Sequence, residues 1–452
     1  MKPDLLNGEI RPTLIKMTVP MMFGIVSLML FNIADSYFVS QLGTDQLAAL
    51  GFTFPVSFTI ISLSIGLSIG TSATIAKLIG SGNWDEAKQL TTDNLLLTTC
   101  MMVVITTAAI LLIDPLFRLL GASDNLMPYI DAYMSVWFSG AIFYVLIMVS
   151  NSSLRASGDT KTPAIIMAFS SVLNLLLDPL LIFGMGPFPA LGIQGAAIAS
   201  VIAWGVTAFL ALLNLYTRKG LLVLHIESFS VAMQHWLMVM KIGFPAALSN
   251  MMTPIAAAIM TAIVATHGSE AVAAFGVGNR LESLSLLANL ALSMTLPPFL
   301  SQNFGRGNIS RVRAAYLLAV KFAIGWQVII YLFLLLFAGG IGGLFSDKAQ
   351  VIDLIGLWIL IVPLGFGFQA VTFLSASSFN ALHQPMRAMR ISIFRLFILY
   401  VPLGFLGNYL SGLQGMFVGF VIANMCTAAM AFWWMRRHLN RLENPQQAME
   451  SH

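Results

Sequence analysis

Twelve long apolar stretches follow one another along this chain, and they leave few folds open to it. Short segments rich in Gly, Pro, Asn and charged residues separate them, as turns require. A helix needs about 20 apolar residues to cross a bilayer, where the backbone must satisfy its own hydrogen bonds. We therefore predict an all-α integral membrane protein with spans at 14–38, 47–76, 91–116, 129–150, 163–184, 193–216, 237–264, 271–301, 313–337, 351–377, 387–407 and 412–434.

The composition excludes several other classes of protein. The chain of 452 residues is 58% hydrophobic and 9% charged, whereas soluble proteins are roughly 25% charged. A soluble enzyme, a nucleic-acid binder and a disordered chain are therefore excluded. The apolar run after the polar first 16 residues is too long for a signal-peptide core, so we expect it to be a membrane helix. Cys100 and Cys426 lie inside apolar runs and suggest no disulfide framework.

The placement of basic residues tests the count of spans. If the N-terminus is inside, 19 of the 23 Lys and Arg residues fall in inside segments. The outside loops carry Arg118 and Lys348, and Arg280 and Lys321 fall within spans. This bias fits the positive-inside rule, and one missed or invented helix would destroy it. We predict a multi-pass protein of the cell inner membrane with both termini in the cytoplasm.

The two halves of the chain resemble each other at a nearly constant offset. Four matches occur in the same order, and three of them are separated by 225 residues. The pairs are Lys16-x3-Pro20 with Lys241-x3-Pro245, Gly80-Ser-Gly82-Asn83 with Gly305-Arg-Gly307-Asn308, Ser152-Ser153-Leu154-Arg155-Ala156 with Ser377-Ser378-Phe379-Asn380-Ala381, and Gly192-Ile193-Gln194-Gly195 with Gly412-Leu413-Gln414-Gly415.

A repeat of six helices in the same orientation predicts two pseudo-symmetric lobes around a central cleft. We place the lobes at residues 1–220 and 221–452, with helices 1–6 in the first, helices 7–12 in the second and a linker at about 217–236. Transporters often place the substrate path at such a repeat interface.

Two acidic residues lie inside predicted spans of the first half. Asp35 is late in the first span and Asp178 is late in the fifth, so both should lie at similar depth in the outer half of the bilayer. A charged residue at the centre of a membrane helix costs roughly 2.5–3.5 kcal/mol on insertion scales. Each acid has an amide nearby: Asn32 precedes Asp35 by three residues, and Asn174 precedes Asp178 by four, on the same helix face.

Two interpretations of these acids remain open. Either they are structural groups that cap neighbouring helices or pair with a buried base, or they form a cation-coupling site. The second half has no acid at the equivalent positions, near Met260 and residues 398–404, which favours a role confined to one lobe. Apolar surroundings and a second carboxylate both favour the neutral form, so such a pair can take up a proton or bind a small cation. Pro20 removes a backbone hydrogen bond and makes the first helix the candidate moving part.

Other polar residues in the spans carry weaker signals. Arg280 and Glu282 are two residues apart and do not face each other, so they are either neutralised by neighbouring helices or lie on the substrate path. Gly66-x-Ser68-x-Gly70 matches the nucleophile elbow of hydrolases, but an elbow needs a strand-to-helix turn, whereas Gly-x-x-x-Gly in a span predicts close helix packing. The sequence has no metal-ligand cluster and no phosphate-binding loop, so we expect no enzyme activity, bound metal or cofactor.

An ordered set of features across essentially the whole chain resembles the MATE (multidrug and toxic compound extrusion) family, and within it the DinF-like branch. The features are the 6+6 repeat of helices, Pro20 and Asp35 in helix 1, Gly80-Ser-Gly82-Asn83 after helix 2, Arg155-Ala-Ser-Gly158-Asp159 after helix 4, and Asn174-x3-Asp178-Pro179 in helix 5.

The resemblance implies a cation-coupled multidrug antiporter that exports small, lipophilic and mostly cationic compounds by alternating access. It implies that Asp35, Asp178 and Asn174 bind the coupling cation and that helix 1 bends at Pro20. By the same resemblance, the substrate pocket contains Asn151, Tyr133 and Asn32. The partners are then small organic cations, drugs and the lipid bilayer, with no nucleic acid, and the protein acts as a monomer.

The resemblance also bears on the coupling ion. Some members bind sodium with a hydroxyl at the position of Ala196, and losing an oxygen ligand weakens such a site, which favours H+ over Na+. Other branches use acids in helices 7 and 10. Here helix 7 has none and helix 10 has only Asp353, at its outer edge, which argues against a cation site in the second lobe.

Two transport alternatives stay open beside a proton-coupled exporter. One is a Na+-coupled exporter. The other is a lipid-linked oligosaccharide flippase of the same superfamily, which would favour several buried basic residues, whereas only Arg280 and Lys321 qualify by sequence. A major-facilitator transporter would carry a Gly-Asp-Arg-type loop after helix 2, and Gly80-Ser-Gly82-Asn83 does not match it.

Overall fold

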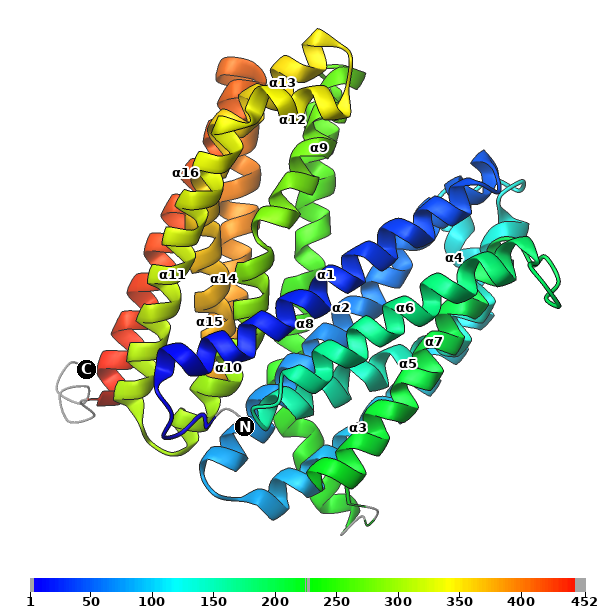
Figure 1. The fold of residues 1–452 in the computed structure, drawn as a ribbon. Helices are drawn as coiled ribbons and strands as arrows, with labels where there is room; N and C mark the ends of the chain where they lie inside the picture. The colour runs from blue at the N-terminus through cyan, green and yellow to red at the C-terminus, as the bar shows by residue number, and fades with distance from the viewer. Residues whose placement is uncertain (1–3, 224, 226–227, 444–452) are drawn as a thin grey trace. The chain divides into compact units, whose positions relative to one another are not determined.

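The computed structural model describes residues 4–223, 225 and 228–443, and these residues form helices and no β-strand (Figure 1). In the first half the helices are α1 (Ile10–Ser40), α2 (Thr44–Gly80), α3 (Trp84–Leu111), α4 (Ile113–Leu119), α5 (Met127–Ala156), α6 (Lys161–Phe183), α7 (Ile193–Asn214) and η1 (Leu215–Lys219). In the second half they are α8 (Phe229–Ala265), α9 (Ser269–Ser285), α10 (Leu287–Gly305), α11 (Ile309–Leu336), α12 (Ala338–Phe345), α13 (Ala349–Ile361), η2 (Val362–Gly365), α14 (Phe366–Ala381), α15 (Pro385–Ile393), η3 (Phe394–Tyr400) and α16 (Val401–Glu443).

The helices confirm the predicted fold class and its spans. Ten helices in the described part of the chain are long and apolar enough to cross a membrane, or eleven if the bent pair α9 and α10 counts as one span. The longest of these, Pro385–Glu443, has 59 residues. It is interrupted at Ser411 and Gly412, whose backbone angles are not helical. That break separates the predicted spans 387–407 and 412–434, so each of the twelve predicted stretches corresponds to helix.

Several predicted spans are less regular than the apolar pattern suggested. The predicted span 91–116 contains the end of α3, a break at Leu112 and the start of α4. The predicted span 271–301 bends by 44° between α9 and α10. The span 351–377 changes to a 3-10 turn at η2, where Pro363 cannot donate a backbone hydrogen bond. Apolarity alone cannot reveal such breaks because it does not depend on backbone geometry.

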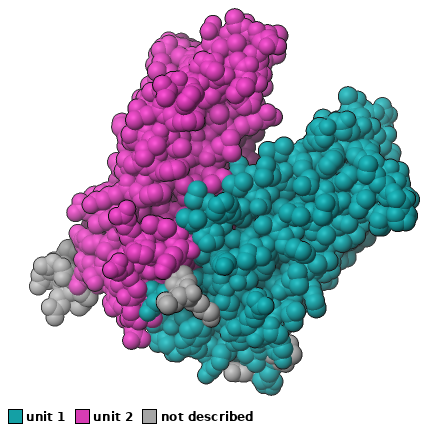
Figure 2. All heavy atoms as spheres, in the orientation of Figure 1, with its two compact units in different colours: residues 1–4, 19–247 teal, residues 5–18, 248–452 magenta. Residues whose placement is uncertain are grey.

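The chain forms two compact units (Figure 2). Unit 1 comprises residues 1–4 and 19–247, and unit 2 comprises residues 5–18 and 248–452. The division therefore does not fall at 220/221, where we placed the boundary between the lobes. Instead α1 begins in unit 2 and ends in unit 1, whereas α8 begins in unit 1 and ends in unit 2. The repeat-related prolines Pro20 and Pro245 each lie within three residues of such a change of unit.

Contacts along residues 221–247 explain why this segment belongs to unit 1. Within the predicted linker 217–236, residues 224, 226 and 227 lie outside the described part of the chain. The Thr92 hydroxyl of α3 donates to the Val223 carbonyl (2.8 Å) and accepts from the Val223 amide (3.0 Å). On α8, His235 Nδ1 donates to the buried Asp93 carboxylate of α3 at 2.6 Å, and Trp236 Nε1 donates to the Asp93 carbonyl at 2.8 Å. The start of α8 is thus hydrogen-bonded to α3.

Close packing joins α8 to α2 within the same unit. A Cβ added at Gly66 would collide with the carbonyl of Gly243, and one added at Gly70 with the carbonyl of Val239. Both glycines are buried in the middle of α2. The Gly-x-x-x-Gly prediction of a close-packing helix face is therefore confirmed.

Residues 5–18 are held in unit 2 in a comparable way. Asn303 Nδ2 on α10 donates to the Leu5 carbonyl (2.9 Å), and Arg311 Nη2 on α11 donates to the Gly8 carbonyl (2.7 Å). At the other end of this segment, Thr18 Oγ1 hydrogen-bonds Thr295 Oγ1 at 2.9 Å. The first helix thus starts in one unit and continues in the other.

The internal repeat is visible in the backbone. Gly82 and Gly307, at equivalent positions, have φ angles of 89° and 80°. Gly192, at the start of α7, has φ 55° and ψ −135°, and Gly412, at the break in α16, has φ 61° and ψ −145°. L-amino acids with a side chain rarely adopt these angles. The matching glycines therefore mark the same turn in both halves of the chain.

Candidate functional site

The two predicted coupling acids lie together in unit 1. Asp178 on α6 is fully buried, and Asp35 on α1 is close enough to interact with it electrostatically. The Tyr133 side chain on α5, also buried, interacts with both carboxylates. Helix α1 and the consecutive helices α5 and α6 thus bring two carboxylates and a phenol into one cluster.

A hydrogen-bonded chain holds one of the acids in place. Asn174 lies one helical turn before Asp178, as predicted. In the amide orientation that satisfies both of its ends, Asn174 Nδ2 donates to Asp178 Oδ2 at 2.9 Å. Asn174 Oδ1 then accepts from the amide of Ser200 on α7 (3.1 Å) and from its hydroxyl (3.0 Å). Ser200 was not among the predicted site residues, because only the packing of α7 on α6 shows that it faces Asn174.

Neither acid has a basic partner in the described residues. No Lys, Arg or His side chain forms an ion pair with Asp35 or Asp178 there. One oxygen of each carboxylate, Oδ1, is buried without a hydrogen-bond partner. A buried acceptor without a donor is costly. The arrangement is thus chemically suited to gain a proton or a cation.

The remaining predicted site residues lie elsewhere. Asn32 is exposed, and its amide donates to the Leu28 carbonyl of its own helix at 2.9 Å. Asn151 is buried near the other end of α5 and both polar atoms of its amide lack a partner. At 1.5 Å per helical residue it lies about 27 Å from Tyr133 along that helix. Pro20 precedes Asp35 by about 22 Å on the same scale, and α1 continues through it.

Unit 2 contains a second, partly buried polar cluster, of which the sequence analysis named only Glu282. Glu282 Oε1 on α9 accepts from Gln369 Nε2 on α14 at 2.7 Å. The guanidinium of Arg395 lies 4.7 Å from the centre of the Phe373 ring, and both Arg395 and Tyr400 interact electrostatically with Glu282. Glu282 thus has polar partners on adjoining helices, which is the first of the two roles considered for it.

The buried basic residues are not those that the sequence suggested. Arg280 and Lys321, placed inside spans, are exposed, whereas Arg155 and Arg395, assigned to inside segments, are buried. Arg155 Nη2 donates to the Ser68 hydroxyl at 3.1 Å. Ser68 is therefore engaged inside α2, which leaves its Gly-x-Ser-x-Gly motif without the turn that a nucleophile requires.

Comparison with known proteins shows which protein family has this architecture. Two segments, residues 20–180 and 245–406, match the MatE family model. They start 225 residues apart, which is the offset of the internal repeat, and together they cover more than half of the chain. The chain belongs to the MATE family. Members of the MATE family are transporters and not enzymes, so the protein is a multi-pass membrane transporter.

Individual MATE relatives are similar over nearly the whole length. A Shewanella oneidensis protein named FAD transporter is 40% identical, with 96% of each chain covered. A Thermotoga maritima protein named probable multidrug resistance protein NorM is 27% identical, covering 91% of this chain and 89% of that one. The crystal structure of the Vibrio cholerae MATE transporter VcmN in the bent form has a TM-score of 0.91 at 34% identity and covers 96% of this chain and 98% of that one.

Proposed function

We propose that the protein is a proton-coupled antiporter that exports small molecules across the cell inner membrane, with Asp35 and Asp178 as the coupling site. The observation that carries this proposal is the pair of neighbouring carboxylates without a basic partner, each with a buried and unpartnered Oδ1. Such a pair is poised to exchange a positive charge, whereas acids in permanent ion pairs would not be.

Each residue of the cluster then has a role. A proton on Asp35 or Asp178 removes a negative charge and turns an unpartnered oxygen into a hydrogen-bond donor. Asn174, held by Ser200, fixes the orientation of Asp178, so Asp35 on α1 is the acid that is free to move. Pro20 has no N–H to bond the carbonyl four residues earlier, and we assign it the hinge that lets this part of α1 respond to protonation.

The oxygen atoms in the cluster favour a proton over sodium. A proton needs one acceptor, and Asp35 and Asp178 each offer one. A hard metal cation needs several converging oxygens. Ala196 supplies none, and the hydroxyl of Ser200, one turn further along α7, is already hydrogen-bonded to Asn174. Sodium coupling is the alternative, and the vesicle experiment described below distinguishes it from proton coupling.

For the exported compound, the first candidate class is lipophilic cations. Relatives named as multidrug resistance proteins support it. Tyr133 offers an aromatic ring next to the two carboxylates, a combination that attracts organic cations. We assign Tyr133 and Asn32 to the substrate pocket at this end of unit 1. Asn151 lies too far along α5 to touch the same bound molecule, so we assign it to a different stage of transport.

The second candidate class is flavin nucleotides, because the relative at 40% identity is named a FAD transporter. FAD joins an aromatic ring system to a negatively charged pyrophosphate. The buried Arg395 has an unpartnered Nε and a stacked aromatic neighbour, Phe373. Guanidinium groups bind phosphate oxygens well. Arg395 therefore favours an anionic aromatic substrate. A flippase of the same superfamily would likewise favour buried basic residues.

The coupling site is tested in inverted membrane vesicles. Ethidium uptake is measured with a proton gradient and, separately, with a sodium gradient. We expect uptake by the native protein with the proton gradient and none by Asp35→Asn or Asp178→Asn, at equal protein levels in the membrane. The matched control is Asp353→Asn, an exposed acid on α13, which should transport normally. Full export by Asp35→Asn would refute the site, and uptake driven only by sodium would refute proton coupling.

The substrate class is tested in the same vesicles with FAD in place of ethidium. If flavin nucleotides are transported, Arg395→Gln should reduce FAD uptake and leave ethidium uptake unchanged, since only FAD carries phosphates. Transport of ethidium but not FAD by the native protein would eliminate the flavin candidate. Normal FAD uptake by Arg395→Gln would show that this arginine does not contact the substrate.

A further inference from the structure

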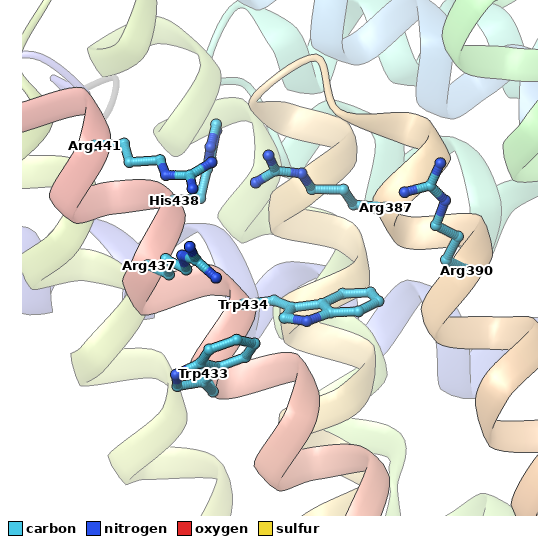
Figure 3. Close-up of a pocket in the computed structure, with 7 residues that line it drawn as sticks. All are labelled: Arg387, Arg390, Trp433, Trp434, Arg437, His438 and Arg441. Atoms are coloured by element: carbon cyan, nitrogen blue, oxygen red, sulfur yellow. The ribbon is translucent and has the colours of Figure 1, made fainter. Parts of the chain in front are cut away.

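A strongly basic pocket in unit 2 takes no part in the proposed coupling. It lies between α15 and the last turns of α16 (Figure 3). In Figure 3 the Arg387 side chain reaches from α15 toward the face of α16 that carries His438 and Arg441. The pocket is lined by Arg387, Arg390, Trp433, Trp434, Arg437, His438 and Arg441.

The lining carries four arginines and no acid. Arg387 lies close enough to the other three for mutual repulsion. None of the four forms an ion pair within the part of the chain that the structure describes, and Glu443, on the same helix, instead pairs with Arg313 at 2.8 Å. Like charges gathered in one hollow raise the energy of the folded protein unless an anion neutralises them.

A buried nitrogen in the pocket also lacks a partner. His438 is 8% exposed, and its Nε2 has no hydrogen-bond partner. Its ring lies 6.0 Å from the Phe379 ring, and the Arg387 guanidinium lies 5.8 Å from the same ring. Histidine and arginine therefore gather around one aromatic side chain. A ligand oxygen in the pocket could accept from both, which would satisfy the histidine nitrogen.

The tryptophans indicate the depth of the pocket relative to the membrane. Trp433 is 55% exposed, and the Arg437 guanidinium lies 5.5 Å from its ring centre. Exposed tryptophans beside arginines are typical of the boundary between the hydrocarbon core and the aqueous phase, where lipid headgroups lie. We predict that this end of unit 2 faces the cytoplasm. The anion that reaches the pocket most readily is therefore one anchored in the membrane itself.

We propose that this pocket binds the phosphate group of an anionic phospholipid, with the arginines and His438 around the phosphate oxygens and Trp433 against the upper part of the acyl chains. Arginine suits this role because its planar guanidinium donates two parallel hydrogen bonds to a phosphate. Basic pockets between membrane helices on the cytoplasmic side are known to recognise such headgroups. The site is independent of the carboxylates in unit 1 and does not rest on the proposed transport activity.

The test uses the purified, delipidated full-length protein and native mass spectrometry. Phosphatidylglycerol, phosphatidylethanolamine and sodium pyrophosphate are titrated separately. We expect phosphatidylglycerol to bind more tightly than phosphatidylethanolamine. The variant Arg387→Gln with Arg437→Gln should weaken phosphatidylglycerol binding about 25-fold, or about fivefold for each arginine. The control Arg306→Gln with Arg436→Gln removes the same charge from exposed positions in unit 2 that do not line the pocket.

Two results would overturn the proposal. Equal weakening by the pocket variant and the control would show that net charge, not the pocket, attracts the lipid. Binding of pyrophosphate as tight as that of phosphatidylglycerol would assign the pocket to a soluble anion. Size-exclusion profiles and melting temperatures of both variants establish that they are folded. His438→Phe, which keeps an aromatic ring but removes Nε2, should weaken lipid binding by a smaller factor than the double arginine variant.

Discussion

Thr18 Oγ1 lies 2.9 Å from Thr295 Oγ1, and Pro20 follows Thr18 by two residues. This hydrogen bond ties the first part of α1 to α10 in unit 2. After Pro20 the same helix runs through unit 1 to Asp35. The proline therefore lies between the segment that is hydrogen-bonded to α10 and the segment that carries Asp35, the proposed coupling acid.

This relationship predicts the effect of Pro20→Ala. Alanine restores the N–H that proline lacks and allows a hydrogen bond to the Lys16 carbonyl. One added backbone hydrogen bond is worth about 1 kcal/mol, so we expect dye export to slow about fivefold while insertion is unaffected. Pro55→Ala in α2, which changes an exposed helical proline, is the control. An unchanged initial rate in Pro20→Ala would remove bending of α1 from the mechanism.

Gly66→Ala should destabilise unit 1. The new methyl group would meet the backbone of α8 at Gly243 and Ala247, which cannot rotate away. Overpacking of this kind costs about 1–3 kcal/mol. We expect a lower melting temperature in detergent, measured by tryptophan fluorescence. Gly51→Ala, in the same helix but with open space at its Cβ, should melt like the native protein or slightly above it; equal melting of both variants would contradict the assigned helix contact.

His235→Ala should also destabilise unit 1, by a different route. It leaves the fully buried Asp93 without its closest partner, although Gln89 Nε2 still donates to the carboxylate at 3.2 Å. Removing one member of a buried pair typically costs about 3–5 kcal/mol. Thermal unfolding of His225→Ala, which alters an exposed histidine in the linker, provides the comparison. The prediction fails if the two variants have the same melting temperature.

A contact near the end of α5 predicts a pH dependence. The Asp159 carboxylate contacts Lys219 and accepts from the amide (3.0 Å) and hydroxyl (2.8 Å) of Thr162. Partial burial acts to raise the pKa of Asp159, but the hydrogen bonds from Lys219 and Thr162 outweigh it and hold the pKa below its ordinary value of 3.8. The contact therefore stabilises the fold above pH 3.8 and loses this effect as the pH falls through the folded-state pKa.

Asp159→Asn should accordingly lower the melting temperature at pH 7. The difference in melting temperature between the variant and the native protein should become smaller below a pH of about 3.8. Melting curves between pH 7 and the acid limit measure this. Asp45→Asn, which changes an exposed acid in the first turn of α2, is the matched control. A difference that stays constant down to the lowest pH would contradict the role given to the ionised carboxylate.

Much of the architecture could be predicted from the sequence because membrane insertion acts on local composition. Twelve apolar runs corresponded to twelve helical stretches. The paired glycines revealed the repeat because Gly192 and Gly412 need a backbone conformation that other residues rarely adopt. The grouping of Asp178 with Asn174 followed from helical periodicity alone. The structure brings Asp35 and Tyr133 to them across helices, and helical periodicity does not reach that far.

Contacts between segments that are distant in the chain could not be predicted from the sequence in the same way. Arg395 follows Pro385 by ten residues and resembles a loop arginine by position, yet it packs on Phe373 and interacts with Glu282, far away in sequence. Ser200 looks like any small polar residue in an alanine-rich helix until α7 is packed on α6. The contact-based units do not follow the predicted lobes at 1–220 and 221–452, because hydrogen bonds such as that of His235 with Asp93 join the start of α8 to α3.

The reciprocal placement of α1 and α8 has a consequence for the origin of the chain. These helices are counterparts in the repeat. The first part of α1 belongs to unit 2, which contains the rest of α8, and the first part of α8 belongs to unit 1, which contains the rest of α1. In an ancestor with one copy, the same exchange would join two identical polypeptides as a domain-swapped dimer. Fusion of two such copies would make that association intramolecular, and so independent of concentration. Neither half of the chain, residues 1–220 or residues 221–452, therefore contains all the residues of one compact unit.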